Sequence, residues 1–319
     1  METGFNQAVE QRYVDLLSNG GFKAFFGDPN NKKEVMMILN TFLPEERKVA
    51  DIDYAQSELQ GPVVGHSKEF RYDFICRDTS GTVFIVEMQR YREKSWFKRC
   101  VSYASRAYDR QNKSGHDYNV QPVYLIGLMG VPIDHPDKEF WKDRYVSEYT
   151  FREKECHDLL DETIVIIFAE LASFRKSEQE CSTRLDRMLY ILKNSGRMHI
   201  PPQWSEYEEC AEVLDACEIG SFDKDKRQKY DSDMYDEKRH NGELIAARED
   251  GYAEGEAKGY AEGEAKGHAE GRAEGRAEGR AEGEAKAQME IARKLLSLGT
   301  DIETVADVTG LDVDVIRGL

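Results

Sequence analysis

Short runs of apolar residues separated by polar turns occupy most of the first 170 residues of the chain. Residues 69–78 and 82–90 are two such runs, and Thr79-Ser80-Gly81 joins them. A short connection that ends in glycine is typical of a type I turn closing on a left-handed residue. This turn predicts a β-hairpin in which Asp73 faces Glu87. The same register pairs further positions: Asp78 with Thr82, Cys76 with Phe84, Ile75 with Ile85, Phe74 with Val86, Tyr72 with Met88, and Arg71 with Gln89.

Other periodic segments place helices and strands around this hairpin. Apolar positions at helical spacing predict helices over residues 33–43, 94–111, 176–195 and 206–219. Continuous or alternating apolar runs predict strands over residues 120–129, 145–151 and 163–168. Strands that alternate with helices in this order favour an α/β core followed by a helical C-terminal region.

From Gly251 to Gly283 every fourth residue is glycine, and alanine follows two places after each glycine. A helix here would contain nine glycines, each opposing it by about 1 kcal/mol, whereas a Glu–Lys pair four residues apart contributes only about 0.2 to 0.5 kcal/mol. Two alternatives stay open. The repeat is either a self-associating helix, in which glycine permits close approach of a second chain, or a flexible polar spacer.

Beyond the repeat, residues 287–298 have helical spacing, and two short helices flank Gly310. Helix, tight turn, helix is the arrangement of a DNA-reading unit. The segment 301–319 is acidic, however, which favours a small packing or dimer-forming cap. The chain is therefore divided into a core domain (1–172), a helical extension (173–222), a charged and repetitive segment (223–286) and a helical cap (287–319).

Composition narrows the class of protein. The 319 residues are 40% hydrophobic, enough for one substantial core. No stretch approaches the roughly 18 apolar residues of a membrane span, and the N-terminus lacks a basic region followed by an apolar one. These features predict a soluble cytoplasmic protein. The six cysteines show no close pairing and are predicted to be reduced core residues.

The net charge of −17 is distributed unevenly. Residues 1–150 carry −2 and residues 151–319 carry −15, yet residues 90–113 carry eight basic against two acidic side chains. This basic run favours binding of a polyanion such as DNA, and a solvated helix face is the alternative. The candidate DNA-binding residues are Arg90, Arg92, Lys98, Arg99, Tyr103, Arg106 and Arg110.

The predicted pairing of Asp73 with Glu87 points to chemistry. Residues directly opposed on two strands have β-carbons roughly 4.5 to 5.5 Å apart, and like charges there are destabilising. A divalent cation between the two carboxylates would remove the repulsion, and Mg²⁺ or Mn²⁺ suits such oxygen ligands. The alternative is that one carboxylate lies in solvent at a frayed strand end.

These residues together resemble a known family. Asp73, then Glu87-Met-Gln89 on the next strand and a helix with Arg99 and Tyr103, resemble the PD-(D/E)XK nuclease superfamily, and within it the recombination-promoting nuclease and putative transposase family. Upstream and downstream segments also resemble it: 21–27, 39–43, Glu58, Gln111, Gly115 and Tyr118. The resemblance covers residues 15–170 and implies a restriction-endonuclease-like fold.

The resemblance further implies a metal-dependent DNA endonuclease, linked to recombination or mobile elements. In it, Asp73 and Glu87 would ligate Mg²⁺ or Mn²⁺, together with the backbone carbonyl of Met88. Gln89 would position the attacking water, and Glu58 would be an auxiliary acid. Partners would be DNA and, through the C-terminal region, further copies of the chain.

One residue departs from the superfamily pattern. Gln89 stands where the name motif has lysine, and a neutral amide can orient water but provides no positive charge. The alternative function is therefore a catalytically weak or inactive protein that binds or regulates DNA on the same fold.

Overall fold

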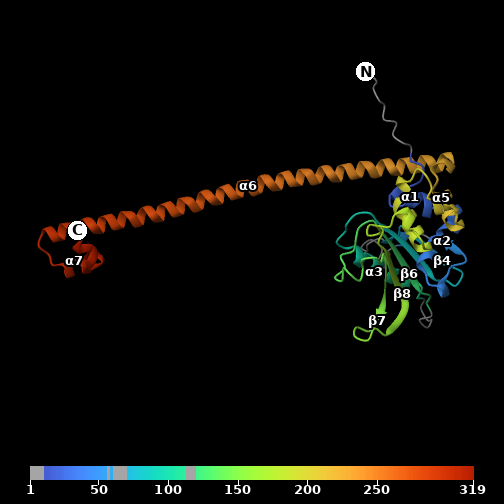
Figure 1. Cartoon of the computed structure of the whole chain (residues 1–319), viewed down its shortest axis with the longest axis horizontal. Coiled ribbons are helices and arrows are strands. Elements are labelled where there is room, and N and C mark those ends of the chain that lie inside the picture. Colours follow the sequence, from blue (N-terminus) through green and yellow to red (C-terminus); the bar gives the residue numbers. More distant parts are fainter. Residues whose placement is uncertain (1–10, 56–57, 60–69, 113–119) are drawn as a thin grey trace, which may run out of the picture. The chain divides into compact units, whose positions relative to one another are not determined.

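The computed structural model describes residues 11–55, 58–59, 70–112 and 120–319, which fall into two compact units, up to residue 240 and from 241 to 319. The first unit contains a six-stranded mixed sheet of order β1-β4-β5-β6-β8-β7 (Figure 1). Its β5–β6 and β6–β8 pairs are parallel, and its other pairs are antiparallel. The strands are β1 (Ile52–Tyr54), β4 (Phe74–Asp78), β5 (Val83–Gln89), β6 (Val123–Met129), β7 (Val146–Arg152) and β8 (Leu159–Ala169), and a separate ladder joins β2 (Glu58–Leu59) to β3 (Phe70–Arg71).

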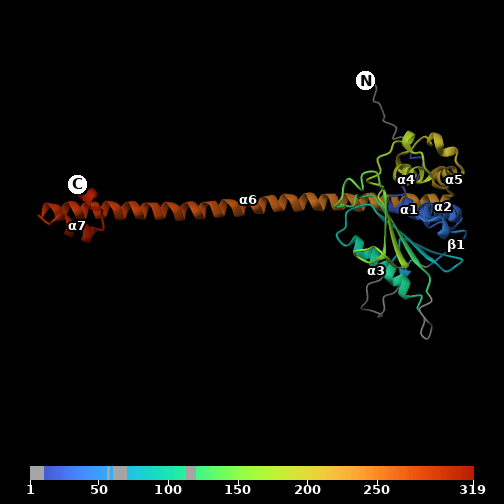
Figure 2. The ribbon, with the colours of Figure 1, turned by 60° about the horizontal axis from the view of Figure 1, so that its bottom comes forward.

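Helices cover both faces of this sheet, as the predicted α/β class requires. Figure 2 shows α3 on one face and the other helices of the core on the opposite face. Alternation along the strands explains the two layers, because Phe74 and Val86 belong to one buried cluster and Ile75 and Ile85 to the other. The helices are α1 (Asn19–Phe26), α2 (Lys32–Phe42), α3 (Trp96–Asp109), α4 (Arg184–Asn194) and α5 (Glu208–Cys217); the short 3-10 turns are Pro29–Asn31, Glu45–Arg47, Glu178–Glu180, Ser195–Arg197, Gln203–Glu206 and Ile219–Ser221.

The predicted register of the hairpin is confirmed along β4 and β5. Phe74 pairs with Val86, and the Asp78 N–H donates to the Thr82 carbonyl oxygen over 3.1 Å. Gly81 has a φ of 89°, the left-handed conformation that this turn needs and that glycine adopts without strain.

The prediction of one strand over residues 69–78 is wrong in its first half. The chain bends at Tyr72 and Asp73, so that β3 and β4 are separate strands. Because β3 pairs with β2, Arg71 faces Glu58 and not Gln89. Tyr72 likewise leaves the cluster that contains Phe74 and packs with the α3 layer, where its hydroxyl donates to the Tyr103 carbonyl oxygen over 3.2 Å.

Two other predictions need correction. Helix α4 begins at Arg184 and not at residue 176, because Thr183 and Asp186 form a capping box that fixes the first turn. All six cysteines are free as expected, but Cys156 is exposed while the other five are buried. No helix among the described residues is long and apolar enough to cross a membrane.

The glycine repeat adopts the helical alternative. It lies within α6 (Lys224–Ser297), a helix of 74 residues. Helices α7 (Ile302–Thr309) and α8 (Val313–Arg317) follow, with Gly310 in the left-handed conformation between them at φ 68°. Ala292, Val305 and Ile316 form the small buried cluster of the second unit.

Candidate active site

Each of the two predicted acids accepts a hydrogen bond from the backbone of the opposite strand segment. Glu87 lies on β5 and Asp73 lies in the bend just before β4. The Asp73 N–H donates to Glu87 Oε1 over 3.1 Å, and the Met88 N–H donates to Asp73 Oδ2 over 2.9 Å. These reciprocal bonds cross-link the two strands. They fix both carboxylates at the end of the hairpin remote from the turn, although Asp73 is no longer a ladder partner of Glu87.

The surroundings of this pair disfavour the ionised form of each acid. Burial raises the pKa of Glu87 well above its usual value, the Asp73 charge raises it further, and Arg99 partly offsets both. Burial also raises the pKa of Asp73, against the Met88 N–H and the charges of Arg99 and Lys23. Glu87 is only 1% exposed, whereas Asp73 keeps contact with solvent. One open side is therefore available to a ligand.

The donor set fits a hard divalent cation. Each carboxylate uses one oxygen to accept a backbone N–H, and the other oxygen accepts no hydrogen bond from the described residues. Mg²⁺ is commonly bound by one or two carboxylates together with waters and substrate phosphate. In the described part of the chain no cluster of three or more His, Cys, Asp or Glu side chains could hold a metal. Among the described side chains, an ion here would thus depend on Asp73 and Glu87.

Glu58, the predicted auxiliary acid, lies on β2 opposite Arg71. Arg71 is two residues before Asp73 in the chain, so the β2–β3 ladder places the Glu58 backbone near the bend that contains Asp73. The Glu58 side chain lies outside the described part of the structure, so its role stays a prediction.

Gln89 is buried, and both ends of its carboxamide have partners within the protein. Its Nε2 donates to the Tyr91 carbonyl oxygen, and its Oε1 accepts from Arg99 Nη2 over 3.1 Å. Arg99 also donates from Nη1 to Glu93 Oε2 over 2.6 Å and lies 4.7 Å over the Trp96 ring. Gln89 therefore orients a cation in this structure.

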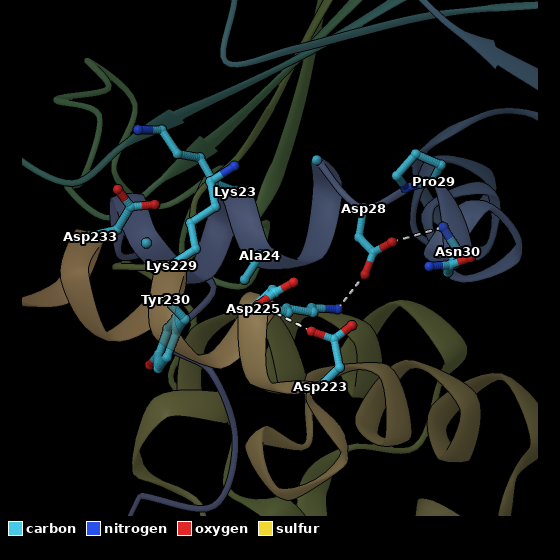
Figure 3. Close-up of a pocket in the computed structure, with 13 residues that line it drawn as sticks. Lys23, Ala24, Asp28, Pro29, Asn30, Asp223, Asp225, Lys229, Tyr230 and Asp233 are labelled. Atoms are coloured by element: carbon cyan, nitrogen blue, oxygen red, sulfur yellow. Dashed lines mark hydrogen bonds and ion pairs between the residues drawn. The ribbon is translucent and has the colours of Figure 1, made fainter.

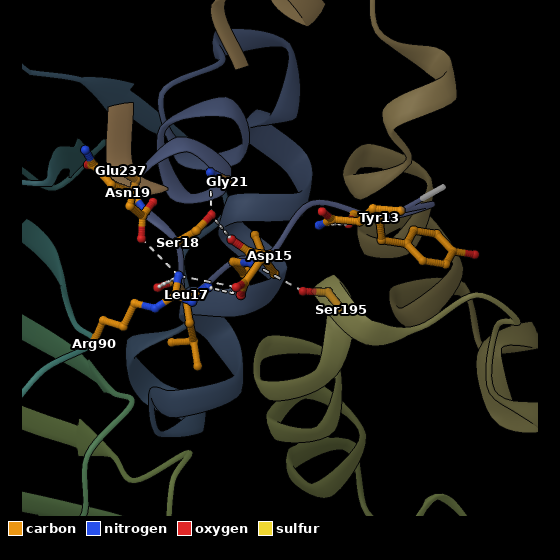
Figure 4. Close-up of polar contacts among 11 residues, drawn as sticks. Tyr13, Asp15, Leu17, Ser18, Asn19, Gly21, Arg90, Ser195 and Glu237 are labelled. Carbon is orange, nitrogen blue, oxygen red and sulfur yellow. Dashed lines mark hydrogen bonds and ion pairs between the residues drawn. The ribbon is translucent and has the colours of Figure 1, made fainter. Parts of the chain in front are cut away.

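Arg90, a predicted DNA-binding residue, has structural partners. Figure 4 shows its guanidinium at the start of α1 and beside the first part of α6. Its Nη1 lies 3.0 Å from Glu237 Oε1 and 3.4 Å from Asp15 Oδ2. Glu237 in turn accepts from the Asn19 N–H over 2.8 Å. Arg90 thus ties the residue after β5 to α1 and α6, a contact between residues 147 apart that no sequence pattern indicated.

The remaining predicted DNA-binding residues differ in exposure. Arg92, Lys98 and Arg110 are exposed, and no ion pair is seen for them among the described residues. Arg106 is partly buried beside Asp109, and the Tyr103 ring packs at 5.0 Å from that of Tyr72.

A cavity of about 160 Å³ adjoins this surface at the C-terminal ends of β5 and β6. Its lining residues are Gln89, Arg92, Glu93, Trp96, Phe97, Met129, Val131, Pro132, Ile133 and Asp134.

A second cavity, of about 350 Å³, lies between α1 and the first turns of α6 (Figure 3). Lysines and aspartates line it together, and Lys226 pairs with Asp28. Because both charge signs are present, the cavity favours neither anions nor cations. Lys23 lines this cavity, and its charge acts on Asp73. The sequence did not single out Lys23, because the spacing of residues along the chain does not show which helix packs near the hairpin.

Comparison with protein families gives two matches. The model of the PD-(D/E)XK nuclease family transposases matches residues 18–243. The model of the C-terminal HTH domain of the Rpn/YhgA-like nuclease family matches residues 285–319. The second match favours the helix-turn-helix interpretation of α7 and α8. The acidic charge of this segment had instead favoured a packing or dimer-forming cap. Curated proteins and solved structures gave no match.

Proposed function

The chain belongs to the PD-(D/E)XK nuclease family transposases, and on this premise we propose that it is a metal-dependent endonuclease that hydrolyses phosphodiester bonds of DNA. The observation that carries the proposal is the cross-strand pair of Asp73 and Glu87, each held by a backbone N–H beside the other. Burial disfavours two ionised carboxylates at this position, and a divalent cation bound between them would offset that cost.

In this proposal Asp73 and Glu87 hold Mg²⁺ or Mn²⁺, with the Met88 carbonyl oxygen as a further ligand. The bound ion would lower the pKa of a water molecule and stabilise charge on the phosphate. The basic residues on and around α3 would hold the DNA backbone, and Arg92, Lys98 and Arg110 are exposed. The matched helix-turn-helix segment would add a second DNA contact, in keeping with a role in recombination or mobile elements.

Nicking of supercoiled plasmid in Mg²⁺, Mn²⁺ or EDTA tests the proposal. Asp73→Ala is expected to remove about 4 kcal/mol of transition-state stabilisation, a loss of about 10³-fold in rate, while the circular dichroism spectrum stays unchanged. Asp53→Ala is a matched control, because Asp53 is an exposed acid on β1. Equal metal-dependent nicking by Asp73→Ala and the unsubstituted protein would refute the assignment.

A second candidate is a DNA-binding protein that does not cleave. Gln89 in place of lysine and the matched HTH segment favour it. The same assay distinguishes the two functions, because this candidate predicts retarded plasmid in a gel but no nicked product with either metal. Self-association through residues 251–286 stays a prediction, which sedimentation of the full chain at several concentrations would check.

A further inference from the structure

The position of the superfamily lysine is occupied here by a neutral residue that already has partners within the protein. Gln89 donates one hydrogen bond to the Tyr91 carbonyl oxygen and accepts one from Arg99. Its amide supplies no positive charge. Hydrolysis at the neighbouring acids adds negative charge to a phosphate, and a cationic side chain near them would stabilise that charge together with the metal ion.

Arg99 is the basic side chain that the packing of α3 brings to Gln89. It lies on the first turn of α3, with one hydrogen bond to Gln89, one to Glu93, and its guanidinium over the Trp96 ring. Its side chain is 26% exposed, so it is neither sealed in the core nor free in solvent. Its Nε is buried without a hydrogen-bond partner among the described residues.

The other basic residues near the acids are arranged differently. Arg90 is engaged by Glu237 and Asp15, on the side of α1 and α6. Lys23 is exposed on α1, and its charge acts on Asp73, whereas the charge of Arg99 acts on both Asp73 and Glu87. Among the described basic residues, Arg99 is the one that combines a fixed position with an effect on both carboxylates.

We propose that Arg99 supplies from α3 the positive charge that a lysine on β5 supplies in the name motif, and that Gln89 is the residue that positions it. This inference rests on the proposed nuclease function. The water oxygen forms a bond to phosphorus, one ester P–O bond breaks, the water proton passes to solvent, and the leaving alkoxide takes a proton from solvent. Arg99 transfers no proton, because a guanidinium stays protonated in proteins; it stabilises the added charge on the phosphate oxygens.

The test is single-turnover cleavage of a plasmid in Mg²⁺ and Mn²⁺ by a set of full-length variants. Arg99→Ala is expected to lower the rate about 10²-fold or more, and Arg99→Lys is expected to recover part of that loss. Gln89→Ala should lower the rate about 10-fold, as removal of a positioning partner does. DNA affinity in EDTA should change much less than the rate in each case. Arg77→Ala, at the exposed turn end of the same hairpin, is the matched control and should cleave normally.

The decisive variant is the double substitution Gln89→Lys with Arg99→Ala, which returns the charge to β5. It should cleave at least about 10-fold faster than Arg99→Ala alone. Cleavage by Arg99→Ala at the unsubstituted rate, or a folded double variant no faster than Arg99→Ala, would overturn the inference. If Arg99→Ala fails to fold, a rate for Arg99→Lys equal to background would overturn it as well. Absence of cleavage by the unsubstituted protein with both metals would instead overturn the proposed function.

Discussion

Glycine has different surroundings in the first unit and in the repeat of α6. A β-carbon added at Gly127 would lie 2.7 Å from the Phe168 ring, and one at Gly130 would lie 3.2 Å from Arg90 Cα. At each of the nine glycines from Gly251 to Gly283, an added β-carbon would meet nothing within 4 Å among the described residues beyond the adjacent turns of the helix. In the first region tertiary packing favours glycine, whereas in the second no contact with the described residues requires it.

Charged residues show the same contrast. Glu87 is 1% exposed, and its environment changes its pKa. Glu254 on α6 pairs with Lys258, but both side chains are more than two-thirds exposed, and such surface pairs contribute little to stability. Buried charge with a changed pKa is therefore found in the first unit, while the charged side chains of the repeat are exposed on a regular helix.

The largest expected effect is a difference in cleavage rate between a substitution in the first unit and substitutions in the repeat. Glu87→Gln should lower metal-dependent cleavage by about 10³-fold, since it removes a charged ligand. Replacement of all nine repeat glycines by alanine should leave cleavage of a short DNA duplex within about 2-fold, because these positions lie outside the site. Initial rates at saturating metal would measure both. A large loss in the alanine variant would break the contrast and indicate a catalytic role for the repeat.

The next effect concerns stability of the first unit. Gly127→Ala should destabilise it by about 1 to 3 kcal/mol, because the new methyl group overlaps the Phe168 ring in a packed layer. All three tryptophans, Trp96, Trp141 and Trp204, lie in this unit. Urea unfolding followed by tryptophan fluorescence therefore reports on it alone. An unchanged midpoint would mean that this layer can relax around the methyl group.

A smaller effect is expected in the stability of the first unit as a function of pH, measured by the same urea unfolding followed by tryptophan fluorescence. The folded pKa of Glu87 is raised, so in the metal-free protein the folded state binds more protons than the unfolded state above about pH 4.3. Stability is then lost as pH rises from that value through the folded pKa. Glu87→Gln does not titrate, so its stability relative to the unsubstituted protein should increase over this window. A relative stability that falls with pH would contradict the direction of this shift.

The smallest effect belongs to the repeat. Gly259→Ala should stabilise α6 by about 0.5 to 1 kcal/mol, since alanine loses less backbone entropy and meets no neighbour. Helical circular dichroism of the full chain during heating would detect it, while tryptophan fluorescence should not change. A destabilising effect, with lower sedimentation mass, would show that this glycine faces a second chain and would support self-association.

The sequence by itself determined the local features of this protein. Gly81 fixed the turn, apolar alternation fixed the register of Phe74 with Val86, and these together placed Asp73 near Glu87. Such features depend on residues within about 20 positions of one another, where backbone preference and side-chain period act directly. The family assignment followed from the same residues.

Only the tertiary structure decided what the side chains around the acids do. Pairing of β3 with β2 turned Arg71 away from Gln89, the packing of α3 on the sheet brought Arg99 to Gln89, and α6 brought Glu237 to Arg90. The helical state of the repeat also lay beyond local propensity, which opposed it. The physical reason is that these contacts depend on where separately specified elements pack, and the pattern along the chain carries no information on which exposed polar residue meets which.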